Sequence, residues 1–475
     1  MHYRELVICF EALTDGVYPV KVRAPSGYGR GHFELPFDAG ELRAVKCRQR
    51  TRPRDLLSTD KQGRSTSTAD LWRTHGKRLF EALFRNRVAA LYHHGRGETD
   101  RDPGLGLRIV LAFAPEPDAS AELAALPWEL LYDPDRRQYL ALDRQAPVVR
   151  RFEVGFVAPP AARSEPFRVL LAAANPPSSA RLQLDREIEH IERALAPLPG
   201  VETASLPQAT ASELRAALTP GRTAVVHFLG HGAASWDRDA FGLWLFAKVG
   251  GDNRVLGPDL GEVFRGVGLR AAVLNACDTG VVPSGPGHDP LDGAASALAA
   301  AGLPVVIGMQ SRIEDRAAVA FSQTLYRELA RGQPAEAAVV EGRLALKAEK
   351  LEDWWTPVLF VSPSAEAPLP EPPDRSAAPA IPGQRLPWLG QAAFWATSTT
   401  IAGMLLKASD RRVRLGSVDQ LYLIIAAGVL LASLPLVLSQ WRQLSRTRRG
   451  WRPAIVGFAL GIAWFLLWQM ATRPW

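Results

Sequence analysis

Two residues with reactive side chains follow apolar runs of the chain. His231 closes the segment VVHFLGH, and Cys277 follows the run AAVLNA, 46 residues after His231. A thiol is a weak nucleophile at neutral pH unless a base removes its proton, and an imidazole beside it can be that base. The pair therefore predicts covalent catalysis, with Cys277 as the nucleophile and His231 as the general base.

The residues next to this pair have their own predicted roles. Gly232 would let the backbone approach a substrate carbonyl, and the N–H groups of Gly232 and Cys277 could form an oxyanion hole. His227 lies inside the apolar run and is predicted to be a core residue. A single buried cysteine is more often a packing residue than a nucleophile. The catalytic hypothesis therefore depends on His231 and Cys277 occurring together.

Polar residues near Cys277 could set the substrate preference. Asn275 and Asp278 flank the cysteine, and Asp315 follows the next apolar segment. A buried carboxylate is costly without a positive partner, so an acidic cleft favours an arginine or lysine side chain of a substrate. Two alternatives stay open. These aspartates could cap helices, Asp315 in particular, and an inward-pointing Arg312 would favour acidic substrates.

The elements that must position these residues alternate between apolar and amphipathic segments from about Pro166 onward. Apolar strands joined by helical crossovers predict a mostly parallel sheet flanked by helices, an α/β fold. Functional side chains collect at the carboxyl ends of such strands. Residues 161–362 are predicted to be this domain. Residues 1–160, with alternating strand-like runs and a helical stretch from Ala69 to about His94, are predicted to be an α+β accessory domain. Within the latter, LAALPWELLYD predicts a packing anchor around Trp128 rather than a catalytic Glu129.

Composition limits the classes of function. The chain has 475 residues and a formal net charge of +7, but residues 384–475 alone carry +9, so residues 1–383 carry −2. The soluble part is not basic, and no nucleic-acid partner is expected. The cysteines are Cys9, Cys47 and Cys277, without metal-ligand spacing. We therefore expect no metal, no cofactor and no disulfide framework.

The C-terminal part is predicted to hold the protein at a lipid bilayer. Residues 363–384 read as a proline-rich linker, and residues 385–475 as a membrane region with two to three transmembrane helices. The apolar stretches are Trp388–Leu406, Leu421–Leu438 and Ala454–Ala471. The loop 441–452 holds five arginines, which favours the cytosolic side. With three spans, the protein is expected in the inner (cytoplasmic) membrane with its soluble domains facing the cytosol.

A specific resemblance adds to these predictions. The segments VVHFLGHG, LNACDTG, LPVVIGMQ, IEDRAAVAFSQTLYRELARG and WWTPVLF resemble the CHAT family of bacterial caspase-like peptidases, which is related to caspases and separases. The resemblance runs over about Phe167–Val361. The spacing from His231 to Cys277 is also similar to that of caspases, in which roughly 50 residues separate the two.

The resemblance implies a caspase-like fold and roles for individual residues. His231 and Cys277 would be the dyad, Asn275 would belong to the primary specificity pocket, and Asp315 to a motif close to the substrate cleft. Trp355 and Pro357 would be structural. The sequence departs from many relatives at Arg312, and it has no helical repeats of the kind that recruit substrates in some of them. The membrane region lies outside the family pattern.

Three functions are weighed against one another. The first is a membrane-anchored cysteine endopeptidase that cleaves a protein substrate, in bacterial defence or regulated proteolysis; a homo-oligomer is compatible with it. The second is a non-catalytic scaffold or sensor at the membrane, and the third is a membrane-disrupting effector triggered by the soluble domains. An intact His–Gly and Ala–Cys pair favours the peptidase, since a vestigial site could lose either member.

Overall fold

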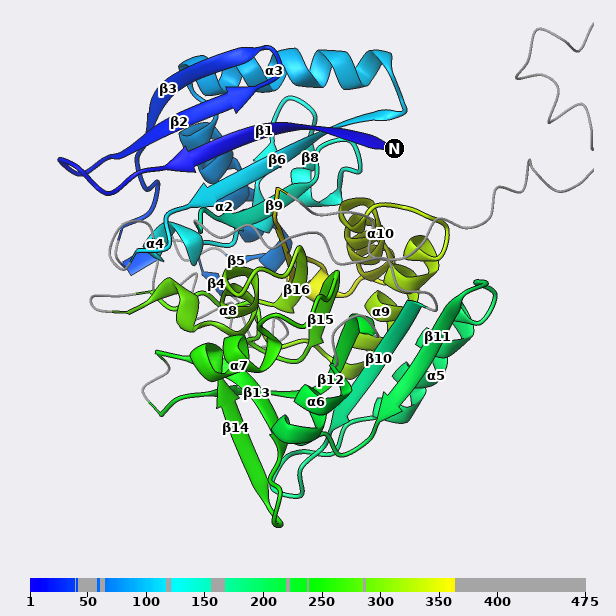
Figure 1. Cartoon of the computed structure of the whole chain (residues 1–475). Coiled ribbons are helices and arrows are strands. Elements are labelled where there is room, and N and C mark those ends of the chain that lie inside the picture. The colour runs from blue at the N-terminus through cyan, green and yellow to red at the C-terminus, as the bar shows by residue number, and fades with distance from the viewer. Residues whose placement is uncertain are drawn as a thin grey trace, which may run out of the picture. The chain divides into compact units, whose positions relative to one another are not determined.

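A computed structural model describes residues 1–38, 40–41, 58–59, 65–116, 121–154, 167–218, 223–236, 239–284 and 288–363. The described chain is built around a 13-stranded sheet (Figure 1). From edge to edge its main path runs β11 (Val201–Leu206), β10 (Phe167–Ala174), β12 (Thr223–Ala234), β15 (Ala271–Asn275), β16 (Val305–Met309), β17 (Pro357–Val361), β9 (Val148–Phe152), β6 (Leu105–Phe113), β1 (His2–Phe10), β2 (Tyr18–Ala24) and β3 (Gly27–Phe33).

The sheet is mostly parallel, as predicted. Strands β11, β10, β12, β15 and β16 pair in parallel, and so do β17, β9, β6 and β1. The pairs β16–β17, β1–β2 and β2–β3 are antiparallel. Strands β15, β16 and β17 are buried at every residue, which explains why they appear in the sequence as continuous apolar runs.

Helices cover both faces of the parallel part. Helices α5 (Leu184–Leu195), α9 (Asp315–Leu329) and α10 (Ala335–Ala348) pack on one face, and α6 (Ala211–Ala217), α7 (Gly257–Phe264) and α8 (Ala294–Ala300) on the other. Successive residues of a strand contribute to opposite faces. Val273 of β15 packs in the apolar cluster that contains α5, α9 and α10, whereas Leu274 packs in the cluster that contains α6, α7 and α8.

The N-terminal part also follows the predicted strands, but its helical stretch differs. The single stretch expected from Ala69 to His94 is two helices, α2 (Thr68–Leu83) and α3 (Asn86–Arg101). Arg85 between them is extended, and Asn86 has a positive φ of 47°. This local conformation ends the first helix and redirects the chain.

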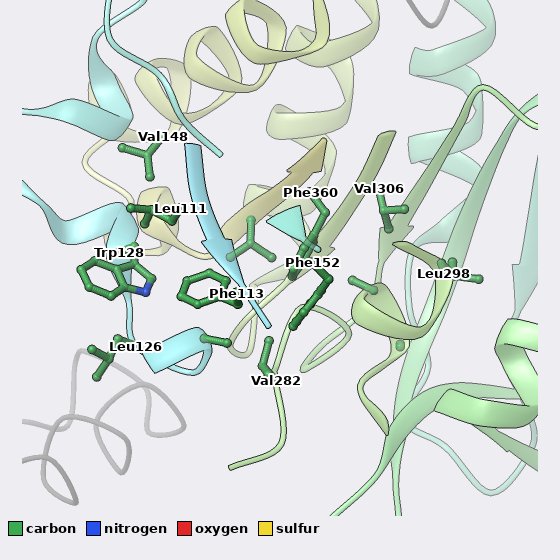
Figure 2. Packing of buried hydrophobic residues seen from close by; sticks show 14 of the residues in the cluster. Leu111, Phe113, Leu126, Trp128, Val148, Phe152, Val282, Leu298, Val306 and Phe360 are labelled. Atoms are coloured by element: carbon green, nitrogen blue, oxygen red, sulfur yellow. The ribbon is translucent and has the colours of Figure 1, made fainter. Parts of the chain in front are cut away.

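One apolar cluster joins elements of the two predicted domains. Figure 2 shows Phe113 of β6 and Phe152 of β9 beside Phe360 of β17, with Trp128 at one end and Val306 of β16 at the other. The rings of Phe152 and Phe360 stack at 5.8 Å. The strand order of the sheet is also continuous across the two predicted domains. The division into domains 1–160 and 161–362 stays a prediction.

A β-hairpin that the sequence did not predict extends β12 beyond the main sheet. Strands β13 (Phe241–Phe246) and β14 (Asp252–Leu256) pair with each other, and β13 pairs with the last residues of β12. A side chain at Gly242 would collide with the Val255 carbonyl oxygen at 1.8 Å. Glycine at this position therefore permits the close approach of the two strands.

The predicted linker and membrane region, residues 363–384 and 385–475, lie outside the described residues apart from Pro363. Among the residues that are described, no helix is both long enough and apolar enough to cross a membrane. The transmembrane helices therefore stay a prediction.

Candidate functional site

The sheet brings His231 and Cys277 to equivalent positions on neighbouring strands. Strands β12 and β15 are parallel, and Leu229 pairs with Asn275. His231 and Cys277 each lie two residues beyond this pair toward the carboxyl end. Both line one cavity of about 1340 Å³. The structure thus places the two predicted residues at the same edge of the sheet, facing the same space.

Gly232 lies directly against the backbone of Cys277. A Cβ at residue 232 would stand 1.7 Å from the Cys277 carbonyl oxygen and 2.9 Å from its carbonyl carbon. Any side chain here would push the cysteine loop away from β12. The structure therefore gives Gly232 a positioning role, in addition to the predicted oxyanion role that stays a prediction.

A backbone carbonyl orients the imidazole of His231. Its Nε2 lies 2.7 Å from the carbonyl oxygen of Ala180, in the loop between β10 and α5. Since a carbonyl can only accept a hydrogen bond, Nε2 carries the proton of the neutral ring and Nδ1 is left as the basic nitrogen. This arrangement suits a general base.

Cys277 is a partly buried thiol in a mixed electrostatic setting. Burial raises the pKa of the thiol most, and the charges of Asp278 and Asp353 raise it further. A hydrogen bond with the backbone N–H of Ile313 and the charge of Arg312 act in the opposite direction and lower the pKa. Because the net effect is upward, the resting thiol holds its proton at neutral pH and needs a base to become a nucleophile.

Asn275 takes part in a buried polar cluster beneath the cavity. Its Nδ2 donates hydrogen bonds to Glu187 Oε1 at 2.5 Å and to Ser322 Oγ at 3.1 Å. The hydroxyl of Ser322 donates to the same Glu187 oxygen at 2.6 Å. Within the described part of the chain, Asn275 Oδ1 has no hydrogen-bond partner. Asn275 and Glu187 both line the cavity, and both are buried.

Glu187 is a buried residue of the cavity lining that sequence reasoning missed. It lies in the first turn of α5, is 4% exposed, and no lysine or arginine of the described residues forms an ion pair with it. The nearest basic group is His227 Nε2, at 3.4 Å. A signal was present in the sequence, because Glu187 stands four residues before Ile191 and eight before Leu195, in phase with the buried stripe of this helix.

His227 is a core residue, as predicted. It is fully buried, and its Nδ1 lies 3.1 Å from the hydroxyl of Tyr326. Burial raises the pKa of Tyr326, and the charge of Glu187 raises it further, so the phenol stays neutral and able to donate. His227 therefore connects the Glu187 cluster with α9 and takes no part in the dyad.

The three charged residues that were expected near the cleft, Asp278, Arg312 and Asp315, all line the cavity. Asp278 follows Cys277 with a positive φ of 60°, a conformation that turns the chain sharply after the nucleophile. Asp315 is exposed and is the first residue of α9, whereas the N-cap residue is Glu314, which makes no side-chain capping hydrogen bond, so Asp315 is not the cap that the alternative expected. Arg312 is also exposed. All three are thus at least partly exposed, unlike Asn275 and Glu187, which are buried.

A second buried cluster surrounds Glu129, which sequence reasoning treated as packing. Glu129 is fully buried and forms an ion pair with Arg150 at 2.5 Å. The side-chain amide of Gln310 donates to Glu129 Oε2 at 2.8 Å and accepts from Arg150 Nη2 at 3.0 Å. Gln310 follows β16 and begins the loop that leads to Ile313. Glu129 thus supports the loop beside Cys277 without reaching the cavity.

The described residues contain no group of three histidine, cysteine or acidic side chains that could hold a metal ion.

Comparisons with known proteins identify the family. A model of the CHAT domain matches residues 73–403, more than half of the chain. A search of curated proteins found no match.

Solved structures show distant similarity. The crystal structure of the Arg-specific cysteine proteinase gingipain R is 13% identical, with a TM-score of 0.40, and the match covers 63% of this chain and 74% of that chain. The Saccharomyces cerevisiae separase–securin complex is 9% identical, with a TM-score of 0.41, and the match covers 75% of this chain and 30% of that chain. Similarity at this level concerns the arrangement of the chain and not its activity.

Proposed function

Since this chain belongs to the CHAT-domain family, whose members are related to caspases, we propose that it is a cysteine endopeptidase with His231 and Cys277 as its catalytic dyad. One observation carries the proposal. The two side chains come from equivalent positions of neighbouring parallel strands and line the same cavity. A cavity of about 1340 Å³ is large enough for several residues of an extended peptide.

The proposed reaction uses the geometry of both residues. Nδ1 of His231 takes the thiol proton, and the Cys277 sulfur attacks the carbonyl carbon of the scissile bond. The N–H groups of Gly232 and Cys277 are proposed to stabilise the oxyanion. The imidazolium then gives its proton to the leaving amine, and an acyl-enzyme remains on Cys277. Water, activated by His231, hydrolyses this thioester and restores the thiol.

We propose that the residue on the acyl side of the cleaved bond is arginine or lysine. The supporting observation is that two buried residues of the cavity lining offer acceptors, the Glu187 carboxylate and Asn275 Oδ1. A carboxylate that is 4% exposed and has no Lys or Arg partner among the described residues is costly to bury, and a guanidinium or ammonium would offset that cost. Asn275, Asp278 and Asp315 were predicted for this role, and Glu187 is now added.

The membrane region completes the proposal. Residues 385–475 would anchor the enzyme in the inner membrane with the peptidase in the cytosol, and residues 363–384 would act as a tether. Reconstitution of the full chain into vesicles tests this, because carbonate washing should leave an integral protein in the membrane. Release of the intact chain by the wash would contradict the anchor. Homo-oligomerisation stays a prediction.

Covalent labelling tests the catalytic proposal. The full chain, purified in detergent, is treated with a peptide carrying a thiol-reactive group, and the modified cysteine is found by mass spectrometry. We expect Cys277 to be modified, and His231→Ala to slow the reaction at least about 100-fold. Cys9 is the internal control. Modification of Cys9 at the same rate as Cys277, or unchanged labelling of His231→Ala, would favour the non-catalytic scaffold.

A further inference from the structure

Two tryptophans lie at the rim of the cavity and have no place in the mechanism above. Trp236 follows β12 and is 100% exposed, and Trp244 lies in β13. Both line the cavity that holds His231 and Cys277. A fully exposed tryptophan presents a large apolar surface to water, and such surfaces at the edge of a cavity are typical of recognition sites.

Trp244 is held in place before any ligand binds. Its Nε1 donates a hydrogen bond to Asp252, and the guanidinium of Arg254 lies 4.9 Å from its ring centroid. On the dyad side, the Trp244 and His231 rings are 6.0 Å apart, at an interplanar angle of 67°. A side chain fixed in this way loses little rotamer freedom when a ligand packs on it.

Trp244 approaches the dyad from the β13–β14 hairpin, and the buried polar cluster approaches it from β15 and α5. Leu243 and Leu245, the residues beside Trp244 in β13, belong to the apolar cluster of α7, and Figure 1 shows the hairpin beside this helix. Because successive residues of a strand face opposite sides, Trp244 projects from the other side of β13, the side of its register partner His231. Asn275 and Glu187 instead contact α9 on the α5 side of the sheet. Trp244 therefore packs beside His231 and contacts other elements than the Glu187 cluster does, so the two can contact different parts of a bound peptide.

The chemistry of His231 points the same way. In the proposed reaction this imidazole must reach the leaving amine, so side chains packed against it border the part of the substrate that follows the cleaved bond. Resting on the proposed function, we infer that Trp236 and Trp244 form a subsite for the first residue after the cleaved bond. The subsite selects an aromatic or large aliphatic side chain, because two indole surfaces offer apolar contact and stacking.

The experiment compares internally quenched peptides that differ only at the residue after the cleaved bond. The full-length protein is assayed for kcat/KM with Phe, Leu, Gly and Glu at this position. We expect wild type to cleave the Phe peptide at least about 10-fold faster than the Gly peptide. Trp236→Ala and Trp244→Ala should reduce this ratio toward one. Val249→Ala is the matched control, since Val249 is 92% exposed on the same hairpin and does not line the cavity.

The ratio separates a subsite from other roles. If Trp244 served only to position His231, Trp244→Ala would slow the Phe and Gly peptides equally and leave the ratio unchanged. Equal rates for Phe and Gly in wild type would overturn the inference while leaving the peptidase intact. A preference that follows the second residue on the acyl side would overturn it as well. Absence of any Cys277-dependent cleavage would instead refute the proposed function, and the subsite with it.

Discussion

Gly232→Ala should disable the site without unfolding the protein. A Cβ at this position would stand 1.7 Å from the Cys277 carbonyl oxygen, whereas real Cβ atoms essentially never come closer than 3.0 Å to another heavy atom. One backbone must therefore retreat by at least 1.3 Å, the difference between the two distances. The cysteine loop and the histidine strand would separate by about this amount.

The expected loss of activity follows from that displacement. A misplacement of about 1 Å between reacting groups can cost on the order of 100-fold in rate. This corresponds to about 2.7 kcal/mol of transition-state stabilisation. We therefore expect kcat/KM of Gly232→Ala to fall about 100-fold. The loss should be mostly in kcat, because the groups proposed to bind the acyl-side residue, Asn275 and Glu187, come from β15 and α5.

The assay needs a control that separates displacement from general damage. Gly97→Ala adds the same methyl group in helix α3, where a Cβ would meet no atom within 4 Å. This control should keep full activity and gain slightly in stability, since alanine favours a helix over glycine by about 1 kcal/mol. Thermal unfolding is measured for both variants. A folded Gly232→Ala protein with activity close to wild type would refute the reasoning.

Three further predictions concern the same site. Cys277→Ala and His231→Ala should each abolish cleavage in a peptide assay, since a dyad acts as a unit, while circular dichroism stays that of the wild type. The rate of Cys277 alkylation should rise with pH through a pKa above the usual cysteine range. Asp353→Asn should lower that pKa and speed alkylation at a given pH, because the Asp353 charge disfavours the thiolate. A slower reaction of this variant would contradict the predicted direction of the pKa change. Glu187→Gln should reduce cleavage after Arg or Lys about 10- to 100-fold relative to neutral residues, whereas Ser322→Ala, which removes one donor to Glu187 but keeps its charge, should preserve the preference.

Much of the fold and the pair of reactive residues could be predicted from the sequence. The runs before His231 and Cys277 are apolar except for His227 and Asn275, because parallel strands covered by helices on both faces bury nearly all their side chains. Turns and small residues after each run then mark the carboxyl ends, where side chains become available. The pattern thus predicted the types of the elements and the position of His231 and Cys277 at one edge of the sheet.

The hairpin β13–β14 was not predicted because its role depends on β12. In isolation, FGLWLF is a short apolar segment that fits several structures. Only its pairing with the last residues of β12, His231 included, turns it into part of the site. The sequence did contain a turn signal, the pair Gly250 and Gly251 between the two strands. In the structure both glycines have positive φ.

The buried acidic residues could not be assigned because charge alone does not reveal burial. Glu187 lies in a helix with other glutamates, and Glu189 two residues later is exposed. Glu129 is enclosed by Arg150 of β9 and by Gln310, which directly follows β16, and both are distant from it in sequence. These partners are brought together by the fold, so no local pattern could indicate them.

These two acidic clusters explain how an apolar scaffold positions a polar site. Packing of β12, β15 and β16 fixes the strands, but it does not fix the loops that follow them. The Glu187 cluster holds Asn275, two residues before Cys277, and the Glu129 cluster holds Gln310, three residues before the Ile313 N–H that contacts the thiol. Directional hydrogen bonds restrict a side chain to few arrangements, whereas an apolar contact tolerates several. The cost of burying two carboxylates is therefore consistent with a nucleophile whose neighbours on both sides are held in place.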